Sequence, residues 1–301
     1  MVQQLKRQSK ELLKRIAQKL LPVMILQWIS TQLKSAVSEP QVSEPQVSEP
    51  LLLIRGWERY AREWKPDALP PQVLPSRHVQ HLGDEWTGER GAHSEEQAYG
   101  LPSDVVANFE AYMNQQLLNS YLPPYAIEGL EIGPGGGRLT TLLVPRTKVL
   151  HVAEPSKAML RHLKQRFAGV SNLRYYHTDG MTLPALRSAS LDYVFAFDVF
   201  IHFEPRLIYW YLRQVADLLK PGGIGIVHYS NVLTQIGWHS FEDQLAANVQ
   251  GRSSYGSFGV MCPQLMTKFL EALGLEVVRA DVELIPRDAI SVFRKPVKQP
   301  L

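Results

Sequence analysis

The sequence predicts an α/β protein with a doubly wound, mostly parallel sheet. Short runs of branched and aromatic residues, bounded by turn residues, alternate with helical patterns, as in strands that helices cover on both faces. The first run ends in a glycine cluster, and the second ends in a carboxylate, Glu154, which stands 21 residues after Gly133. Such alternation implies right-handed crossovers and a ligand at the carboxyl ends of the strands.

Each element has a local reason in the sequence. Four buried strands are predicted at 127–132, 149–153, 191–197 and 224–227. Ser156 stands in N-cap position after Pro155 and predicts a helix to residue 167. Pro205 near a first turn predicts a helix that ends before the Lys-Pro-Gly-Gly stop signal. Further helices are predicted at 104–121 and 262–274, with two closing strands at 275–278 and 289–293.

The glycine-rich turn after the first strand excludes two phosphate-binding motifs. A dinucleotide fingerprint that starts at Gly133 needs glycine where Arg138 stands, and a P-loop needs a Lys-Ser or Lys-Thr pair that is missing. The turn instead satisfies an acid-x-G-x-G-x-G pattern, made by Glu131, Gly133, Gly135 and Gly137. A nucleoside without a pyrophosphate is therefore the expected ligand.

With these motifs in order, the chain resembles the class I S-adenosylmethionine-dependent methyltransferases. The resemblance implies that the glycine-rich turn, including Glu131, wraps the methionine part of the cofactor S-adenosylmethionine, and that Glu154 binds the ribose hydroxyls. Asp179 and Gly180, after the third strand at 175–178, would lie near the adenine amino group. The family also implies a seven-stranded Rossmann-like sheet with an antiparallel C-terminal hairpin, and methyl transfer as the activity.

The chemistry follows from that cofactor. Its sulfonium already makes the methyl group electrophilic, so the protein has to bind, align and desolvate the reactants. The acceptor is expected over strands four and five, near Asp198, His202 and His228. A histidine suits the removal of a hydroxyl proton, with His202 as first choice and His228 as second. The expected acceptor is a small molecule or a sugar, although an amine or carbon acceptor would need no base.

Two other functions stay open from the sequence. One is an NAD(P)-dependent oxidoreductase on a similar sheet, which Arg138 disfavours; the other is a non-catalytic cofactor-binding relative, which the retained carboxylates disfavour. No metal is expected, because no Cys/His grouping has ligand spacing and Ser230 stands where a Mg²⁺ site beside Asn231 would want an acid.

The chain divides into four predicted segments: 1–36, 37–50, 51–125 and 126–296, the last being the cofactor-binding domain. The first segment carries 7 basic residues and 1 acidic residue and predicts a basic amphipathic helix for a membrane surface or a protein partner. The second repeats Val-Ser-Glu-Pro and predicts an extended linker. The third is expected to form a cap beside the domain.

The remaining features of the sequence limit the expected cellular location and the expected partners. The chain outside the first segment carries a net charge of −3, and its basic residues form no stripe, so no nucleic-acid partner is expected. A single Cys262 suits a reducing cytoplasm, and the location is expected to be cytoplasmic, with peripheral membrane contact through the first segment as an option. Residues 232–261 are expected to form a polar insertion over the active-site mouth, or only a surface loop.

Overall fold

The computed structural model describes residues 54–55, 57–58, 101, 108–249 and 258–297. The chain divides into two compact units, Met1–Ser48 and Glu49–Leu301, and every described residue belongs to the second. The predicted basic helix at 1–36, the linker at 37–50, most of the cap at 51–125 and the glycine-serine stretch at 251–257 lie outside the described residues. Those predictions therefore stay untested.

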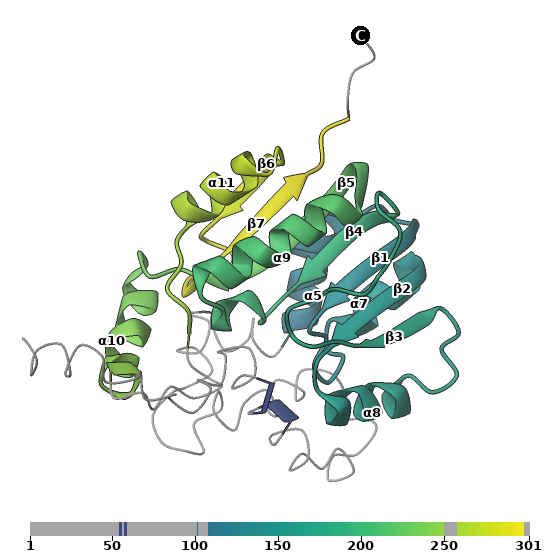
Figure 1. The fold of residues 1–301 in the computed structure, drawn as a ribbon, viewed down its shortest axis with the longest axis horizontal. Helices are drawn as coiled ribbons and strands as arrows, with labels where there is room; N and C mark the ends of the chain where they lie inside the picture. Colours follow the sequence, from purple (N-terminus) through teal and green to yellow (C-terminus); the bar gives the residue numbers. More distant parts are fainter. Residues whose placement is uncertain (1–53, 56, 59–100, 102–107, 250–257, 298–301) are drawn as a thin grey trace, which may run out of the picture. The chain divides into compact units, whose positions relative to one another are not determined.

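The described part is built on one seven-stranded sheet with the order β3-β2-β1-β4-β5-β7-β6 (Figure 1). The first five strands pair in parallel, and β7 runs antiparallel to both β5 and β6. The strands are β1 (Ala126–Ile132), β2 (Thr147–Glu154), β3 (Leu173–His177), β4 (Leu191–Ala196), β5 (Leu219–Ser230), β6 (Glu276–Asp281) and β7 (Asp288–Arg294). The predicted class, including the antiparallel C-terminal hairpin, is confirmed.

Helices cover both faces of this sheet, as the apolar strands predict. They are α5 (Phe109–Met113), η3 (Asn114–Leu118), α6 (Asn119–Tyr121), α7 (Thr140–Leu143), η4 (Val144–Arg146), α8 (Lys157–Arg166), η5 (Phe200–His202), α9 (Pro205–Leu218), α10 (Gln235–Val249) and α11 (Pro263–Ala272). Apolar side chains of α5, α7 and α8 pack on one face, and those of α9 and α11 pack on the other. In Figure 1, α9 lies in front of the sheet.

Strand β4 shows why both layers form. Its side chains alternate between faces, so Phe195 joins the cluster under α5, α7 and α8, while Val194 joins the cluster under α9 and α11. From Tyr193 to Ala196 every side chain of the strand is buried, and only Asp192, near its amino end, is partly exposed. A strand with this composition can only lie between two helical layers.

Local signals set the helix starts. The Ser156 hydroxyl accepts a hydrogen bond from the Met159 N–H at 3.1 Å, so the predicted N-cap of α8 is confirmed. Helix α9 begins with Pro205 in its first turn and Glu204 as its cap, again near the predicted start. The segment predicted as one helix at 104–121 is described from residue 108 onward and holds a π-helical turn, Asn114–Leu118, in its middle.

Two predictions of local structure are wrong in detail. The Lys-Pro-Gly-Gly segment is not a free turn: β5 starts at Leu219, and the segment bulges out between the pairs Leu191–Leu219 and Tyr193–Ile224. The region 232–261 is not a continuous loop, because α10 occupies Gln235–Val249. The Thr234 hydroxyl accepts from the Gly237 N–H at 2.9 Å, a start signal that the polar composition obscured.

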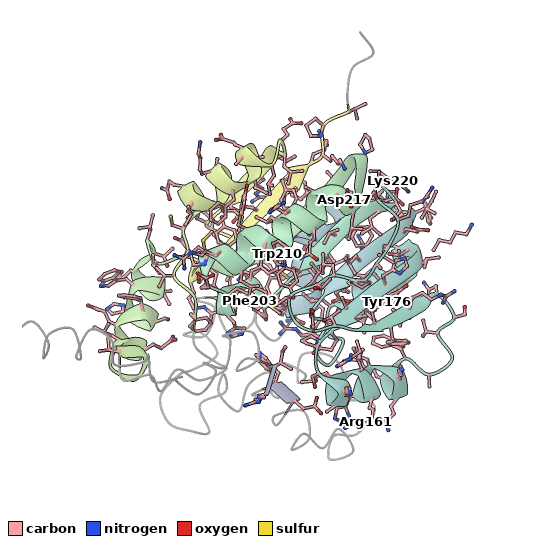
Figure 2. The ribbon with its side chains drawn as sticks, in the orientation of Figure 1. Arg161, Tyr176, Phe203, Trp210, Asp217 and Lys220 are labelled. Atoms are coloured by element: carbon pink, nitrogen blue, oxygen red, sulfur yellow. The ribbon has the colours of Figure 1, made fainter. Side chains whose placement is uncertain are left out.

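The two ends of the sheet differ in character (Figure 2). At the amino end of β4, the Lys220 ammonium pairs with Asp192 at 2.6 Å on the surface. Lys220 follows the last turn of α9, whereas Phe203 precedes its first turn and lies well away from this pair. The carboxyl ends of β1, β2 and β4 instead meet around a pocket that Phe203 helps to line. Among the described residues, no helix combines the length and apolar character that crossing a membrane requires.

Candidate active site

A pocket with about 1040 Å³ of empty space, part of it open to solvent, lies at the carboxyl ends of β1, β2 and β4. Its wall combines the turn after β1, the end of β2, the segment after β3 and the segment after β4. The lining residues include Glu131, Gly133, Gly135, Arg138, Glu154, Thr178, Gly180, Asp198, His202 and Phe203, together with Ile54 and Trp57. Parallel strands bring these residues together from distant parts of the chain.

The backbone of the glycine-rich turn has a conformation that residues with a side chain rarely adopt. Gly133, Gly135 and Gly137 have φ of +64°, +53° and +85°. A Cβ at Gly133 would stand 2.4 Å from a methyl group of Val199, on the pocket wall. At Gly137 the close neighbour is the Phe167 ring at 2.5 Å, so this glycine lets the turn approach α8 and does not line the pocket.

Glu154 ends β2 and lines the pocket with 5% of its surface exposed. Its carboxylate accepts a hydrogen bond from the Ser156 N–H at 2.8 Å. Burial raises the pKa of Glu154 to about 7, although the N–H groups of Ser156 and Gly135 favour the ionised form. The carboxylate is thus held by backbone at the strand end, where it can accept from the hydroxyls of a ligand.

Glu131 lies deeper, within β1, and is 3% exposed. It accepts a hydrogen bond from the Thr140 hydroxyl at 2.7 Å. Burial raises the pKa of Glu131 to about 8, against smaller opposing effects of Thr140 and the nearby positive charge of Arg166. The pocket therefore holds two carboxyl groups that titrate near neutral pH, an arrangement that is common at functional sites.

The structure gives Asp179 a different task from the one expected. Its carboxylate is exposed and accepts from the N–H groups of Met181 at 2.9 Å and Thr182 at 2.6 Å, which closes a tight turn. The neighbours Thr178 and Gly180 line the pocket, whereas the Asp179 side chain is not part of its wall. Gly180 therefore lies on the pocket wall and the Asp179 carboxylate does not, while the contact of either residue with the adenine end of a cofactor stays a prediction.

Asp198 lies two residues after the end of β4 with a φ of +57°, which is unusual for a residue with a side chain. Its carboxylate pairs with Arg138 at 3.1 Å, and both residues line the pocket. Arg138 also lies over the Phe109 ring at 4.6 Å. The structure therefore places Asp198 at the predicted site. It also places the Arg138 cation there, a residue that the sequence analysis used only to exclude a dinucleotide-binding motif.

His228 does not reach the pocket wall. Its side chain is fully buried in β5, with Nδ1 3.2 Å from Asp198 and Nε2 3.1 Å from Asp288. Its ring stacks on Phe197 at 4.1 Å. The choice of His228 as second candidate base is therefore corrected. His228 lies two residues before the end of β5, and both of its ring nitrogens already face carboxylates, so neither can take a proton from an acceptor.

His202 is the predicted base that the structure does place in the pocket. It ends the short helix η5 and is 7% exposed. Its ring meets Trp57 edge-on at 5.4 Å and stacks on Phe258 at 5.8 Å. The His202 imidazole thus packs between two aromatic rings, which restrict its orientation.

Comparison with known proteins shows what this domain is similar to. The sequence model of a family described as a methyltransferase domain matches residues 130–223, from within β1 to the first residues of β5. This likeness supports S-adenosylmethionine as the cofactor.

Solved structures show the same fold. A chain of the complex that contains the Haloferax volcanii Trm112 methyltransferase activator is 16% identical, with a TM-score of 0.51, over 67% of this chain and 97% of that one. The PH0226 protein of Pyrococcus horikoshii OT3 is 17% identical, also with a TM-score of 0.51, over 72% of this chain and 98% of that one. No curated protein sequence matches the chain.

The pocket fits this cofactor chemically. A ribose diol needs hydrogen-bond acceptors, and Glu154 supplies a backbone-held carboxylate. An amino-acid end carries one positive and one negative charge, and Asp198 and Arg138 supply the opposite ones. Gly133 leaves room for close approach of backbone. Among the described residues, no group of three His, Cys, Asp or Glu side chains is arranged to hold a metal ion.

Sequence reasoning missed part of the wall. Ile54 and Trp57 line the pocket from a segment about a hundred residues before β2, and Tyr211 reaches it from α9. Glu58 accepts from the Ser156 hydroxyl at 2.7 Å and the Ala158 N–H at 3.1 Å, which ties this early segment to the start of α8. The available signal was the aromatic cluster of Trp57, Tyr60 and Trp64, a pattern that is more often core packing than a ligand site.

Proposed function

We propose that the chain transfers the methyl group of S-adenosylmethionine to a hydroxyl of a small acceptor, with His202 as the base. The observation that carries the proposal is the position of His202 in the same pocket as Glu154 and the glycine-rich turn. When bound, the cofactor supplies an electrophilic methyl group. The protein then has to orient the acceptor, exclude water and take one proton.

Each predicted cofactor residue has a proposed part. Glu154 accepts from the ribose hydroxyls, and Gly180, beside Thr178, leaves space for the adenine ring. Glu131, Gly133 and Gly135 surround the amino-acid end. The support is that all of these residues line one pocket at the strand ends. Asp198 is proposed to contact the amino-acid end together with Arg138.

The acceptor side favours a molecule with an apolar face. Trp57, Phe197, Phe203 and Tyr211 contribute aromatic surface to the wall. Among the described lining residues, Arg138 is the only cation, and it is paired with Asp198. A sugar ring or an aromatic ring that carries a hydroxyl would meet such a wall, whereas a phosphorylated acceptor would meet, among the described lining residues, only the cation that Asp198 already pairs with.

The test combines binding and transfer. Wild-type protein should bind S-adenosylhomocysteine by calorimetry and should transfer labelled methyl groups to one fraction of a cell extract. His202→Gln should lower kcat by about 100-fold or more, in line with the usual contribution of a general base, and leave cofactor affinity unchanged. His151→Gln is the matched control, because His151 is also a buried histidine but contacts Tyr176 outside the pocket.

The outcomes separate the alternatives. Binding of NADH in place of S-adenosylhomocysteine would support an oxidoreductase. Binding without transfer to any fraction would support a non-catalytic relative. Full transfer by His202→Gln would reject the base and favour an amine or carbon acceptor. Membrane contact or partner docking by residues 1–36 is a separate proposal, which a binding assay with anionic vesicles tests.

A further inference from the structure

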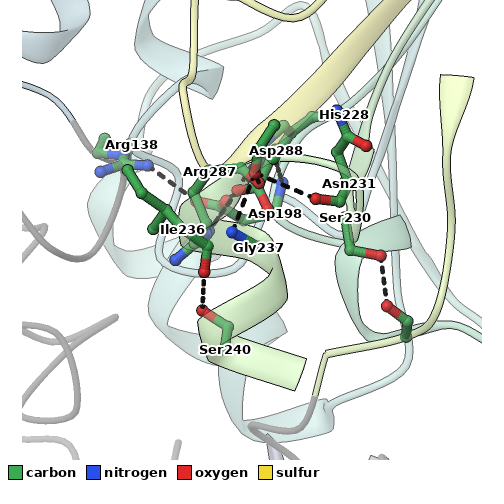
Figure 3. A network of polar contacts seen from close by, with 12 residues as sticks. Arg138, Asp198, His228, Ser230, Asn231, Ile236, Gly237, Ser240, Arg287 and Asp288 are labelled. Atoms are coloured by element: carbon green, nitrogen blue, oxygen red, sulfur yellow. Dashed lines mark hydrogen bonds and ion pairs between the residues drawn. The ribbon is translucent and has the colours of Figure 1, made fainter. Parts of the chain in front are cut away.

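Five ionisable side chains from distant parts of the chain contact one another in succession (Figure 3). Arg138 contacts Asp198 at 3.1 Å, Asp198 contacts His228 at 3.2 Å, and His228 contacts Asp288 at 3.1 Å. Arg287 closes the series by donating from Nε to Asp288 at 2.8 Å. We call these five residues the charge chain.

The charge chain is shielded from water along its whole length. Its side chains are 5%, 8%, 0%, 2% and 4% exposed, in order from Arg138 to Arg287. Charges in such surroundings are strongly coupled, because little solvent screens them. Removing one member leaves its neighbour as an uncompensated buried charge, so the members are expected to hold one another in place.

Only one end of the charge chain belongs to the pocket. Arg138 and Asp198 are part of its wall, whereas His228, Asp288 and Arg287 are not. The remote end comes from the C-terminal hairpin, where Asp288 pairs with Ser230 of β5 in the antiparallel register. The hairpin is thereby connected to the cofactor site through polar contacts, although it contributes no residue to the pocket wall.

His228 is the link between the two ends. Burial alone would lower the pKa of His228, but hydrogen bonds and charge attraction from Asp198 and Asp288 together raise it. Nδ1 accepts a hydrogen bond from the Asp198 backbone N–H, so the proton of the ring lies on Nε2, which donates to the Asp288 carboxylate. Asp288 can hold this state because Arg287 and His228 together keep the pKa of its buried carboxyl low.

The conformation of Asp198 needs such support. A left-handed backbone is strained for a residue with a side chain, and such strain persists where surrounding contacts fix it. His228 Nδ1 lies 3.2 Å from both the backbone N–H and the carboxylate of Asp198. Stacking of the His228 ring on Phe197, the preceding residue, fixes the same turn from a third direction.

We propose that Asp288 and Arg287 are positioning residues that act through His228 to hold Asp198 and Arg138 in the orientation required for cofactor binding. The inference rests on the proposed cofactor site. Neutralising Asp288 removes the carboxylate that holds the His228 proton on Nε2, and the Asp198 backbone N–H then loses its acceptor at Nδ1. Asp198 and Arg138 should relax, and the amino-acid end of the cofactor should bind less tightly.

The experiment measures affinity for S-adenosylhomocysteine by calorimetry at pH 7.5 in the full chain. Asp288→Asn should weaken binding by about 10- to 100-fold, the range for loss of a hydrogen bond between charged groups. Asp281→Asn is the matched control: Asp281 is a buried carboxylate of the same hairpin, it accepts from the Leu284 N–H at 2.6 Å, and it does not line the pocket. This control should bind within about twofold of wild type.

Further variants separate positioning from loss of structure. Arg287→Lys keeps the positive charge and should retain most of the affinity, whereas Arg287→Met should behave like Asp288→Asn. Equal affinity of Asp288→Asn and wild type would overturn the inference. Failure of wild type itself to bind S-adenosylhomocysteine would reject the proposed function, so the two failures are distinguishable.

A measurement on wild type applies even if Asp288→Asn does not fold. Nitrogen NMR of the imidazoles should show the His228 proton on Nε2 and Nδ1 as an acceptor at pH 7.5. Addition of S-adenosylhomocysteine should shift the His228 signals and leave those of His151 in place. His228 signals that ignore the added compound would overturn the inference.

Discussion

The raised pKa of Glu154 predicts that cofactor affinity depends on pH in a range where carboxyl groups are normally ionised and do not titrate. A ribose hydroxyl donates to the ionised carboxylate, so the protonated form binds poorly. Because burial raises the pKa of Glu154 to about 7, the binding form is lost as pH falls through 7, and not through the usual acidic range. Cofactor binding should accordingly release protons at neutral pH.

The magnitude follows from the ionised fraction. With a pKa of about 7, roughly one half of the Glu154 carboxyls are ionised at pH 7, and roughly one in eleven at pH 6. The Kd of S-adenosylhomocysteine should therefore weaken about fivefold from pH 7 to pH 6 and tighten nearly twofold at pH 8. Glu154→Gln should weaken binding by about 10- to 100-fold at pH 8 and should flatten the dependence.

Calorimetry across pH 5.5 to 8.5, in two buffers of different ionisation enthalpy, measures both the Kd and the proton release. Glu131→Gln shows how much of the slope belongs to the neighbouring acid, whose pKa is about 8. Glu110→Gln is a matched control, since Glu110 is buried but does not line the pocket. A flat wild-type profile, or wild-type affinity in Glu154→Gln, would refute the reasoning.

Three other outcomes are expected. Gly137→Ala should lower stability by more than about 1 kcal/mol because a Cβ there meets a ring, whereas Gly169→Ala, at a similar φ but in open space, should cost only the backbone strain; denaturant unfolding compares them. In the folded protein the pKa of Glu131 is raised to about 8, so folding is favoured while this carboxyl is protonated. The contribution of Glu131 to the free energy of unfolding should therefore fall by up to about 5 kcal/mol from pH 5 to pH 8 and beyond. Urea titrations should show that Glu131→Gln removes this part of the pH dependence. Leu212→Ala, at a fully buried position of α9, should cost about 2–5 kcal/mol and lower Tm; an unchanged Tm would contradict the packing described for that face.

Features that depend on neighbours in sequence were predictable. The alternation of apolar runs and helices gave the sheet class, and Ser156 marked the start of α8 correctly. The glycine spacing and Glu154 gave the two strand ends of the pocket, because a parallel sheet collects its strand ends at one edge whatever the other details are. His202 and Asp198 followed from their distance beyond the fourth strand.

Other features depend on contacts between distant residues, and the sequence does not encode them locally. Asp179 and His228 both looked like ligand-facing residues, but a turn engages one and two carboxylates engage the other. The early segment that contains Trp57 joins the pocket wall across a long sequence separation. Helix α10 was not predicted, because the polar sequence of residues 232–261 obscures its helical pattern.

The sequence by itself determined which strands exist and where a nucleoside cofactor would lie, because period, turn residues and strand-end acids are local properties. Only the tertiary structure decided how the acids and bases are partnered. Asp288 stands 60 residues after His228, and the antiparallel register of β5 and β7 alone brings them together. The charge of a buried side chain is set by what surrounds it in space, and that is fixed only when the chain has folded.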